Sequence, residues 1–147
     1  MAGQILSNRL LKKIREEMGA VYSIGAGSRM DRVSDQNVIL QIPFPMDPAQ
    51  REAVLAEIAN ILNDMATSVS AEELDPIKEY MVKNAKESIV KNEDWAGFLA
   101  AETLNGVDTF TNTVETVQSI TPEDISAFMK QLINAGNLRY FILDPAE

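Results

Sequence analysis

The sequence predicts an α+β fold in which about five helices cover a small antiparallel sheet of about three strands. Long segments repeat apolar residues every three to four positions, which is typical of amphipathic helices. Shorter segments alternate apolar and polar residues, as half-buried strands do. No internal repeat or low-complexity linker interrupts the 147 residues, so we expect a single α+β domain over residues 1–147.

The first predicted helix covers residues 5–18 and ends before Gly19, because glycine adopts the left-handed conformation of a helix end at little cost. Its apolar stripe recurs at every fourth position: Leu6, Leu10, Ile14 and Met18. Strands are predicted at residues 20–28 and 37–44. The polar residues 29–36 between them suit a hairpin connection that extends past the sheet.

Three later helices begin with a clear N-terminal capping signal. Each has a capping side chain and a reciprocal side chain three positions further on. These starts are Asp47 with Gln50, Ser70 with Glu73, and Thr121 with Asp124. Pro48 and Pro122 stand where proline is tolerated, in the first turn. The stripes that follow predict a core built from Val54, Ile58, Ile61, Leu62, Met65, Leu74, Ile77, Met81, Ile125, Phe128, Met129 and Leu132.

Between the last two of these helices we expect a helix ending at Gly106, and then a short helical turn at residues 114–117. Trp95 and Phe98 in this helix could anchor a partner, but we favour ordinary packing in the core or between subunits. The apolar residues 138–145 read as a last strand that ends with Pro145. Long helices over so few strands indicate that further strands belong to this sheet.

Composition excludes several classes of function. The net charge of −9 opposes binding to nucleic acid or to an anionic membrane surface. No apolar run approaches the about 20 residues of a membrane-spanning helix, so no membrane insertion is expected. The chain has no cysteine and no histidine, which excludes disulfides, thiol chemistry and a Ser-His-Asp apparatus, and makes it a poor ligand for zinc. We therefore expect no cofactor in this chain.

Two local patterns have ordinary explanations. The segment GAGSRM imitates a glycine-rich phosphate loop but lacks its third glycine and its lysine, so hairpin glycines explain it better. Acidic residues gather at Glu72, Glu73 and Asp75 and again at Glu123 and Asp124. They could bind a hard cation, but acidic first turns of helices are sufficient, since they complement the helix dipole.

Arg15 and Tyr22 are the candidate functional residues. They flank Gly19, and a helix that reverses there into a strand can bring both side chains to one rim. A guanidinium fork and a phenol suit a carbonyl oxygen or its oxyanion, although neither activates water at neutral pH. They would be the supporting half of a site. The structural alternative makes Arg15 a solvated helix residue and packs the Tyr22 ring on the core.

The segment LLKKIREEMGAVYSIGAG resembles the C-terminal half of the insulinase/pitrilysin (M16) family of zinc metallopeptidases. The family pattern is close to L-x-x-x-[IL]-R-E-x-x-G-x-x-Y-S, which is met by Leu10, Ile14, Arg15, Glu16, Gly19, Tyr22 and Ser23. VSAEELDPIKEYMVKNAKESI is similar to the family's long central helix. ITPEDISAFMKQLI and NLRYFILDP are similar to its closing helix and strand.

This resemblance implies two α+β halves facing each other like a clamshell around a chamber. The N-terminal half would bind zinc through an H-x-x-E-H motif, which this histidine-free chain lacks. Arg15 would then hold a carbonyl of the peptide substrate, and Tyr22 would stabilise the oxyanion. The chain would be an N-terminally truncated C-terminal domain, inactive alone, with zinc in the missing N-terminal peptidase domain or partner subunit.

Alternatives remain open at the level of sequence. A non-catalytic scaffold or partner subunit of the same architecture would use the motif only for packing, and an unrelated α+β binding module is a third reading. If strands are missing, the isolated chain should form a homodimer through an exposed sheet edge. The acidic, cysteine-free composition suits a bacterial protein of the periplasm.

Overall fold

The computed structural model describes residues 1–30, 38–106 and 108–144, and it confirms an α+β fold with a small antiparallel sheet. Its elements, in chain order, are α1 (Ala2–Leu10), the π-helix η1 (Leu11–Glu17), β1 (Gly27–Met30), β2 (Val38–Gln41), the 3₁₀ turn η2 (Pro48–Gln50), α2 (Arg51–Thr67), α3 (Ala71–Ser88), α4 (Asn92–Asn105), α5 (Thr113–Ser119) and α6 (Pro122–Asn134). None of the described helices is long and apolar enough to span a membrane.

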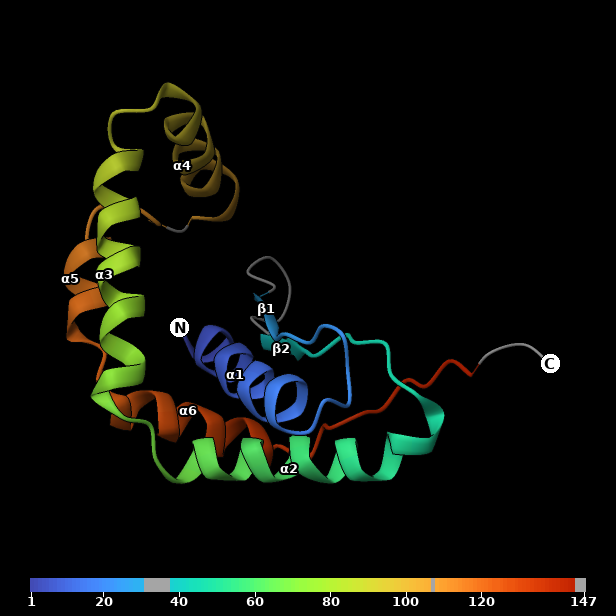
Figure 1. Ribbon diagram of the computed structural model, residues 1–147. Helices are drawn as coiled ribbons and strands as arrows, with labels where there is room; N and C mark the ends of the chain where they lie inside the picture. The colour runs from blue at the N-terminus through green and yellow to red at the C-terminus, as the bar shows by residue number, and fades with distance from the viewer. Residues whose placement is uncertain (31–37, 107, 145–147) are drawn as a thin grey trace.

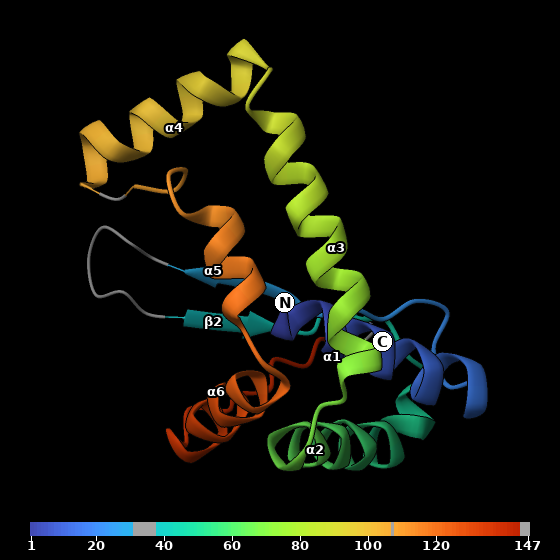
Figure 2. The ribbon, with the colours of Figure 1, turned by 90° about the vertical axis from the view of Figure 1, so that its left-hand side faces the viewer.

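The helices divide into a packed base and a projecting arm (Figure 1). In the base, α2 packs along α6, and α1 lies over them with the hairpin on its other side. In the arm, α3 rises from the end of α2 with α5 packed beside it, and α4 lies at the far end of α3 (Figure 2). The first helix therefore sits between the helical base and the sheet.

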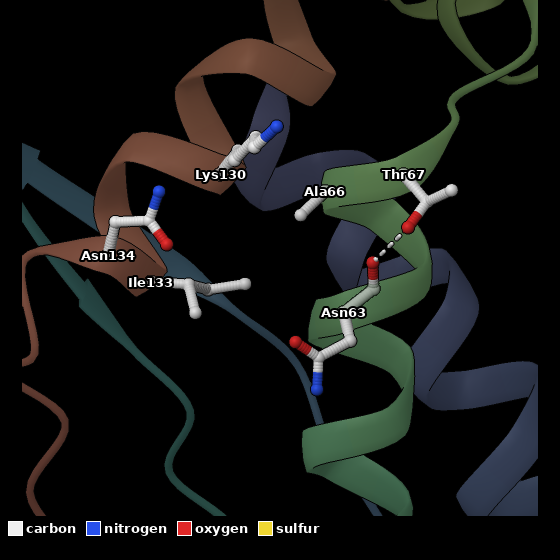
Figure 3. A pocket seen from close by; sticks show the side chains of 6 residues that line it. All are labelled: Asn63, Ala66, Thr67, Lys130, Ile133 and Asn134. Atoms are coloured by element: carbon white, nitrogen blue, oxygen red, sulfur yellow. Dashed lines mark hydrogen bonds between the residues drawn. The ribbon is translucent and has the colours of Figure 1, made fainter.

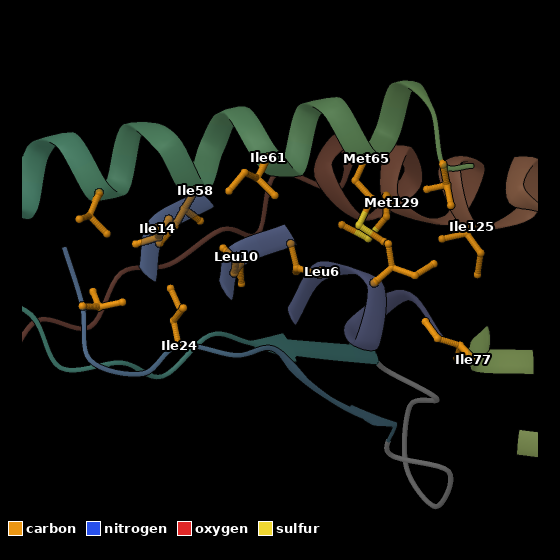
Figure 4. Close-up of a cluster of buried hydrophobic side chains, with 14 of the residues drawn as sticks. Leu6, Leu10, Ile14, Ile24, Ile58, Ile61, Met65, Ile77, Ile125 and Met129 are labelled. Carbon is orange, nitrogen blue, oxygen red and sulfur yellow. The ribbon is translucent and has the colours of Figure 1, made fainter. Parts of the chain in front are cut away.

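The core lies where α1, η1, α2, α3 and α6 meet (Figure 4). The predicted stripes supply its most deeply buried side chains, among them Leu6, Leu10, Ile14, Val54, Met65, Leu74 and Met129. Met18 was expected on the first stripe but is exposed. The reason is local: its N–H donates to the carbonyl of Lys13 at 3.0 Å, five residues back, so the π-helical turn rotates Met18 off the stripe.

The predicted capping boxes of α3 and α6 are confirmed. The amide of Glu73 donates to Ser70 Oγ at 3.3 Å, and Thr121 and Asp124 make the equivalent pair at 3.2 Å. Asp47 also caps, since it accepts from the amide of Ala49 at 2.9 Å. It caps η2, however, so that the α-helix itself starts only at Arg51. The predicted end of α4 at Gly106 is confirmed by a left-handed φ of 63°.

The sheet is smaller than predicted. Its two described strands pair antiparallel, from Gly27 opposite Gln41 to Met30 opposite Val38. Of the predicted strand 20–28, only the last two residues lie in β1, and the predicted third strand is wrong because residues 138–144 form no ladder. A β-rich segment becomes a strand only beside a partner, and residues 138–144 find none in the described part of the chain. Most of the predicted hairpin connection, residues 31–36, and Pro145 lie outside the described residues.

Candidate functional site

Arg15 lies on η1, close to the point where the first helix ends. The amide of Met18 bonds to Lys13 O at 3.0 Å and the amide of Ala20 bonds to Ile14 O at 3.1 Å, so the last turn is wide. Gly19 between them has a φ of 61°. A residue with a Cβ is disfavoured in that conformation, which explains why glycine stands at the reversal. Such π-helical turns are rare in proteins, and many of those that occur lie at functional sites.

Tyr22 lies in the segment that leads from this reversal to β1. Ala20, Val21 and Ile24 are buried in the core, and Tyr22 between them points outward with 86% of its surface exposed. The far end of the segment is fixed to α1, because the amide of Ala26 donates to Ser7 Oγ at 2.7 Å. The structural alternative required the Tyr22 ring to pack on the core. The ring does not pack there, because it is largely exposed.

Arg15 is exposed as well. Within residues 1–30, 38–106 and 108–144, neither Arg15 nor Tyr22 forms a hydrogen bond or an ion pair, whereas the neighbouring Lys13 bonds to Glu17 at 2.8 Å. The two side chains flank one glycine turn, and the structure shows no bond between them. Chemically they offer a guanidinium fork and a hydroxyl as hydrogen-bond donors, and neither is bonded to a described residue.

A surface cavity of about 430 Å³ lies between α2 and α6 (Figure 3). It is lined by Asn63, Ala66, Thr67, Lys130, Ile133 and Asn134, and Thr67 Oγ1 donates to the carbonyl of Asn63 at 3.0 Å. Neither Arg15 nor Tyr22 lines it. Arg15 and Tyr22 thus lie on the exposed surface, outside this cavity.

The second cavity, about 290 Å³, lies beside α4. Trp95 and Phe98, for which the sequence favours ordinary packing in the core or between subunits, line it and lie outside the main core. Phe110 joins them and was missed, because a single phenylalanine in a polar stretch gives no periodic signal. The sequence cue that could have found it is Asp108, whose side chain accepts the amides of Phe110 and Thr111, each at 2.8 Å.

One residue of each acidic cluster, Glu73 or Asp124, caps a helix. Glu73 accepts from the amide of Ser70 at 3.0 Å, and Asp124 accepts from the amide of Thr121 at 2.8 Å. In the described ranges, no group of three or more His, Cys, Asp or Glu side chains is placed to hold a metal ion. With no histidine or cysteine in the sequence, the residues of this chain do not fit a zinc ion.

Residues 1–81 match the family model described as Peptidase M16 inactive domain. This match covers more than half of the chain and includes Arg15, Gly19 and Tyr22. No curated protein matches the sequence.

Three solved structures of bacterial proteins share the fold over 88% of this chain. They are the periplasmic protease PqqL from Escherichia coli (TM-score 0.76, 17% identity), a peptidase M16 inactive domain from Pseudomonas fluorescens (0.69, 20%) and a protease from Helicobacter pylori (0.72, 17%). The aligned part is 15% of the first chain and 33% of each of the others. The chain therefore spans at most a third of the length of these structures.

Proposed function

Because this chain belongs to the peptidase M16 family, as its C-terminal inactive domain, we propose that it is the substrate-binding part of a zinc metalloendopeptidase. In this proposal the chain faces an N-terminal peptidase half across a chamber. Arg15 and Tyr22 reach from this wall toward the backbone of a bound peptide. The pair supports the reaction and does not itself attack the peptide bond.

The observation that carries the proposal is the outward position of Tyr22. A large aromatic side chain with 86% of its surface exposed gains little from folding, so its placement needs another reason. Buried neighbours on both sides and the anchor at Ser7 hold its backbone in place. In this proposal the fixed backbone places the hydroxyl at the rim, where a bound peptide would complete its position, and a donor placed in this way stabilises developing charge.

The two side chains have different parts in this proposal. The Tyr22 hydroxyl donates to the oxygen that becomes negative when the scissile carbonyl turns tetrahedral. The Arg15 guanidinium, a planar fork of donors, holds a neighbouring carbonyl and so fixes the position of the peptide. Zinc would be bound and water activated in the other half, as the family resemblance implies, since this chain has no ligands for the metal.

The test is peptide hydrolysis by the complete peptidase carrying Tyr22→Phe or Arg15→Ala. Removing an oxyanion donor should lower kcat by about 10-fold or more, and removing the guanidinium should also raise KM. Matched controls are Tyr80→Phe, an exposed tyrosine on α3, and Lys12→Ala, an exposed cation on η1. Turnover that equals the controls would mean that the motif is architectural.

A non-catalytic partner subunit is the second candidate, and the description of the matched family as an inactive domain favours it. In that case the chain would close the chamber without contacting the reacting bond. The kinetics of Tyr22→Phe distinguish the substrate-binding role from the non-catalytic role. If the chain only encloses the chamber, we expect Tyr22→Phe to leave both kcat and the stability of the complex unchanged.

We also propose the bacterial periplasm as the location of the protein. The support is the likeness to PqqL, which is described as a periplasmic protease, together with the cysteine-free, acidic composition. Cell fractionation should recover the protein with periplasmic markers. Recovery with cytosolic markers would contradict this part of the proposal.

A further inference from the structure

The cavity beside α4 joins aromatic rings to carboxylates. Its volume is about 290 Å³, and its lining includes Trp95, Phe98, Leu99, Glu102, Asp108 and Phe110. One side is the helix α4, and the other is the turn that begins at Asp108. No lysine or arginine is among its lining residues.

The three rings form one cluster. The centroids of Trp95 and Phe110 are 4.7 Å apart, those of Phe98 and Phe110 are 5.1 Å apart, and Trp95 meets Phe98 edge-on at 6.0 Å. The indole N–H of Trp95 donates to the carbonyl of Ile89 at 2.8 Å, which fixes the ring. Trp95 nevertheless remains 36% exposed, and none of the rings belongs to the main core. Part of the Trp95 ring is therefore accessible to a ligand.

The two charged side chains that line the cavity, Glu102 and Asp108, are both acidic. From residue 92 to residue 129 the sequence has no lysine or arginine, and its charged residues are Glu93, Asp94, Glu102, Asp108, Glu115, Glu123 and Asp124. Hydrogen bonds from the side chain and amide of Thr111 and from the amide of Phe110 lower the pKa of Asp108, so this carboxylate is ionised at neutral pH. Glu102 faces the same cavity from α4.

We propose that this cavity binds a lysine or arginine side chain of a peptide. A cation within about 6 Å of an aromatic centroid is attracted by the ring quadrupole, and neighbouring carboxylates attract it further. The aliphatic stem of the same side chain can cover the rings, while its charged head stays near Glu102 and Asp108. The inference deepens the proposed function by naming basic peptides as the substrate class, with a binding site apart from Arg15 and Tyr22.

The only tryptophan of the chain lines this cavity, so its fluorescence reports binding directly. The 147-residue chain would be titrated with three blocked peptides, Ala-Lys-Phe-Ala and two versions in which norleucine or glutamate replaces lysine. The lysine peptide should give a saturable change in Trp95 emission, with at least about 5-fold weaker binding of the other two. Equal binding of all three peptides, or no saturable change, would overturn the proposal.

Charge variants separate the cavity from general acidity. Glu102→Gln should weaken binding of the lysine peptide several-fold. Glu79→Gln, the same change at an exposed position on α3 away from the cavity lining, should not. An equal effect of the two variants would mean that only the net charge attracts the peptide. Circular dichroism of both variants shows that the comparison is between folded chains.

The titration needs no catalysis, so its outcome does not depend on the outcome of the kinetic test of Tyr22. Unchanged turnover in Tyr22→Phe would remove the proposed catalytic support and leave the binding of basic peptides in place. Loss of selectivity for the lysine peptide would remove this inference and leave the part proposed for Tyr22 intact.

Discussion

Arg9 and Glu73 join the first helix to the third. Arg9 Nε donates to Oε1 of Glu73 at 2.6 Å and Arg9 Nη2 donates to Oε2 at 2.8 Å, a bidentate pair. The same guanidinium donates to the carbonyl of Ser68 at 3.0 Å, next to the capping box of α3. One side chain thus fixes both the start of α3 and its position on α1. Bidentate pairs of this kind are the stronger ion pairs of protein surfaces.

Glu73→Gln should destabilise the chain in a pH-dependent way. The hydrogen bonds from Arg9, aided by those from Ser70, lower the pKa of Glu73 from 4.5 to about 2. A lowered pKa means stabilisation that is complete above about pH 4.5 and is lost as pH falls toward 2. Because the Glu73 side chain is 31% exposed, we expect a loss of about 1–2 kcal/mol at pH 7, discounted for screening by solvent.

The measurement is urea unfolding of both proteins at pH 7 and at pH 2. The difference between wild type and Glu73→Gln should shrink at the lower pH, while Glu72→Gln, an exposed neighbour, should stay close to wild type at both. An undiminished difference at pH 2 would mean that the carboxylate charge is not what stabilises the junction.

The glycine that ends η1 decides how the chain turns toward Tyr22. A Cβ built on Gly19 meets nothing within 4 Å, so any cost of alanine there comes from the φ of 61° alone. Gly97, inside α4, also has open space around it but has no positive φ. The two glycines therefore isolate the effect of backbone conformation from that of packing.

Gly19→Ala should lower the free energy of unfolding by about 1 kcal/mol, because an L-residue is strained in the left-handed region. Gly97→Ala should raise it by about 0.5–1 kcal/mol, since alanine is the better helix former. Thermal unfolding of both variants checks the pair. A stabilising Gly19→Ala would contradict the account of how the first helix ends.

How much the sequence predicts depends on the range of the interactions. The capping boxes at Ser70 and Thr121 and the stop at Gly106 were predictable because they involve neighbours along the chain. The third strand was not, because pairing for residues 138–144 requires a partner strand. The bond between Arg9 and Glu73 joins residues 64 positions apart, and no local pattern reveals it.

The candidate site follows the same rule. A short motif around Gly19 predicts Arg15 and Tyr22 as site residues, and the structure shows that both side chains are exposed. Their outward direction could not be derived, since it depends on the burial of Val21 and Ile24 in a core built from distant helices. The aromatic cavity is not predictable from the sequence: Trp95 and Phe98 suit ordinary packing or a partner anchor, and Phe110 meets them only through the fold.

At the scale of the whole molecule, residues 138–144 are exposed although they are largely apolar. Phe141 is 95% exposed and Leu143 is 98% exposed, and Ile39 in β2 is exposed too. Apolar, β-prone segments without a partner favour association with another chain. In the proposed peptidase, strands from the rest of the protein would cover this surface.

We therefore predict that the 147-residue chain alone forms a homodimer. Multi-angle light scattering should show a mass near twice that of one chain, and the double variant Phe141→Ser, Leu143→Ser should shift it toward the monomer. Exposed serines at Ser68 and Ser119 show that the fold accepts this residue on its surface. A monodisperse monomer at high concentration would contradict this prediction.

In the proposed function, Tyr22 binds the transition state of peptide hydrolysis. The most direct measurement compares Tyr22→Phe with wild type in the complete peptidase, using a peptide in which a tetrahedral phosphinate replaces the scissile amide. We predict that the variant binds this analogue about 10-fold or more weakly, by the same factor that it loses in kcat/KM, with KM little changed. Equal binding of the analogue to both proteins would contradict the claim.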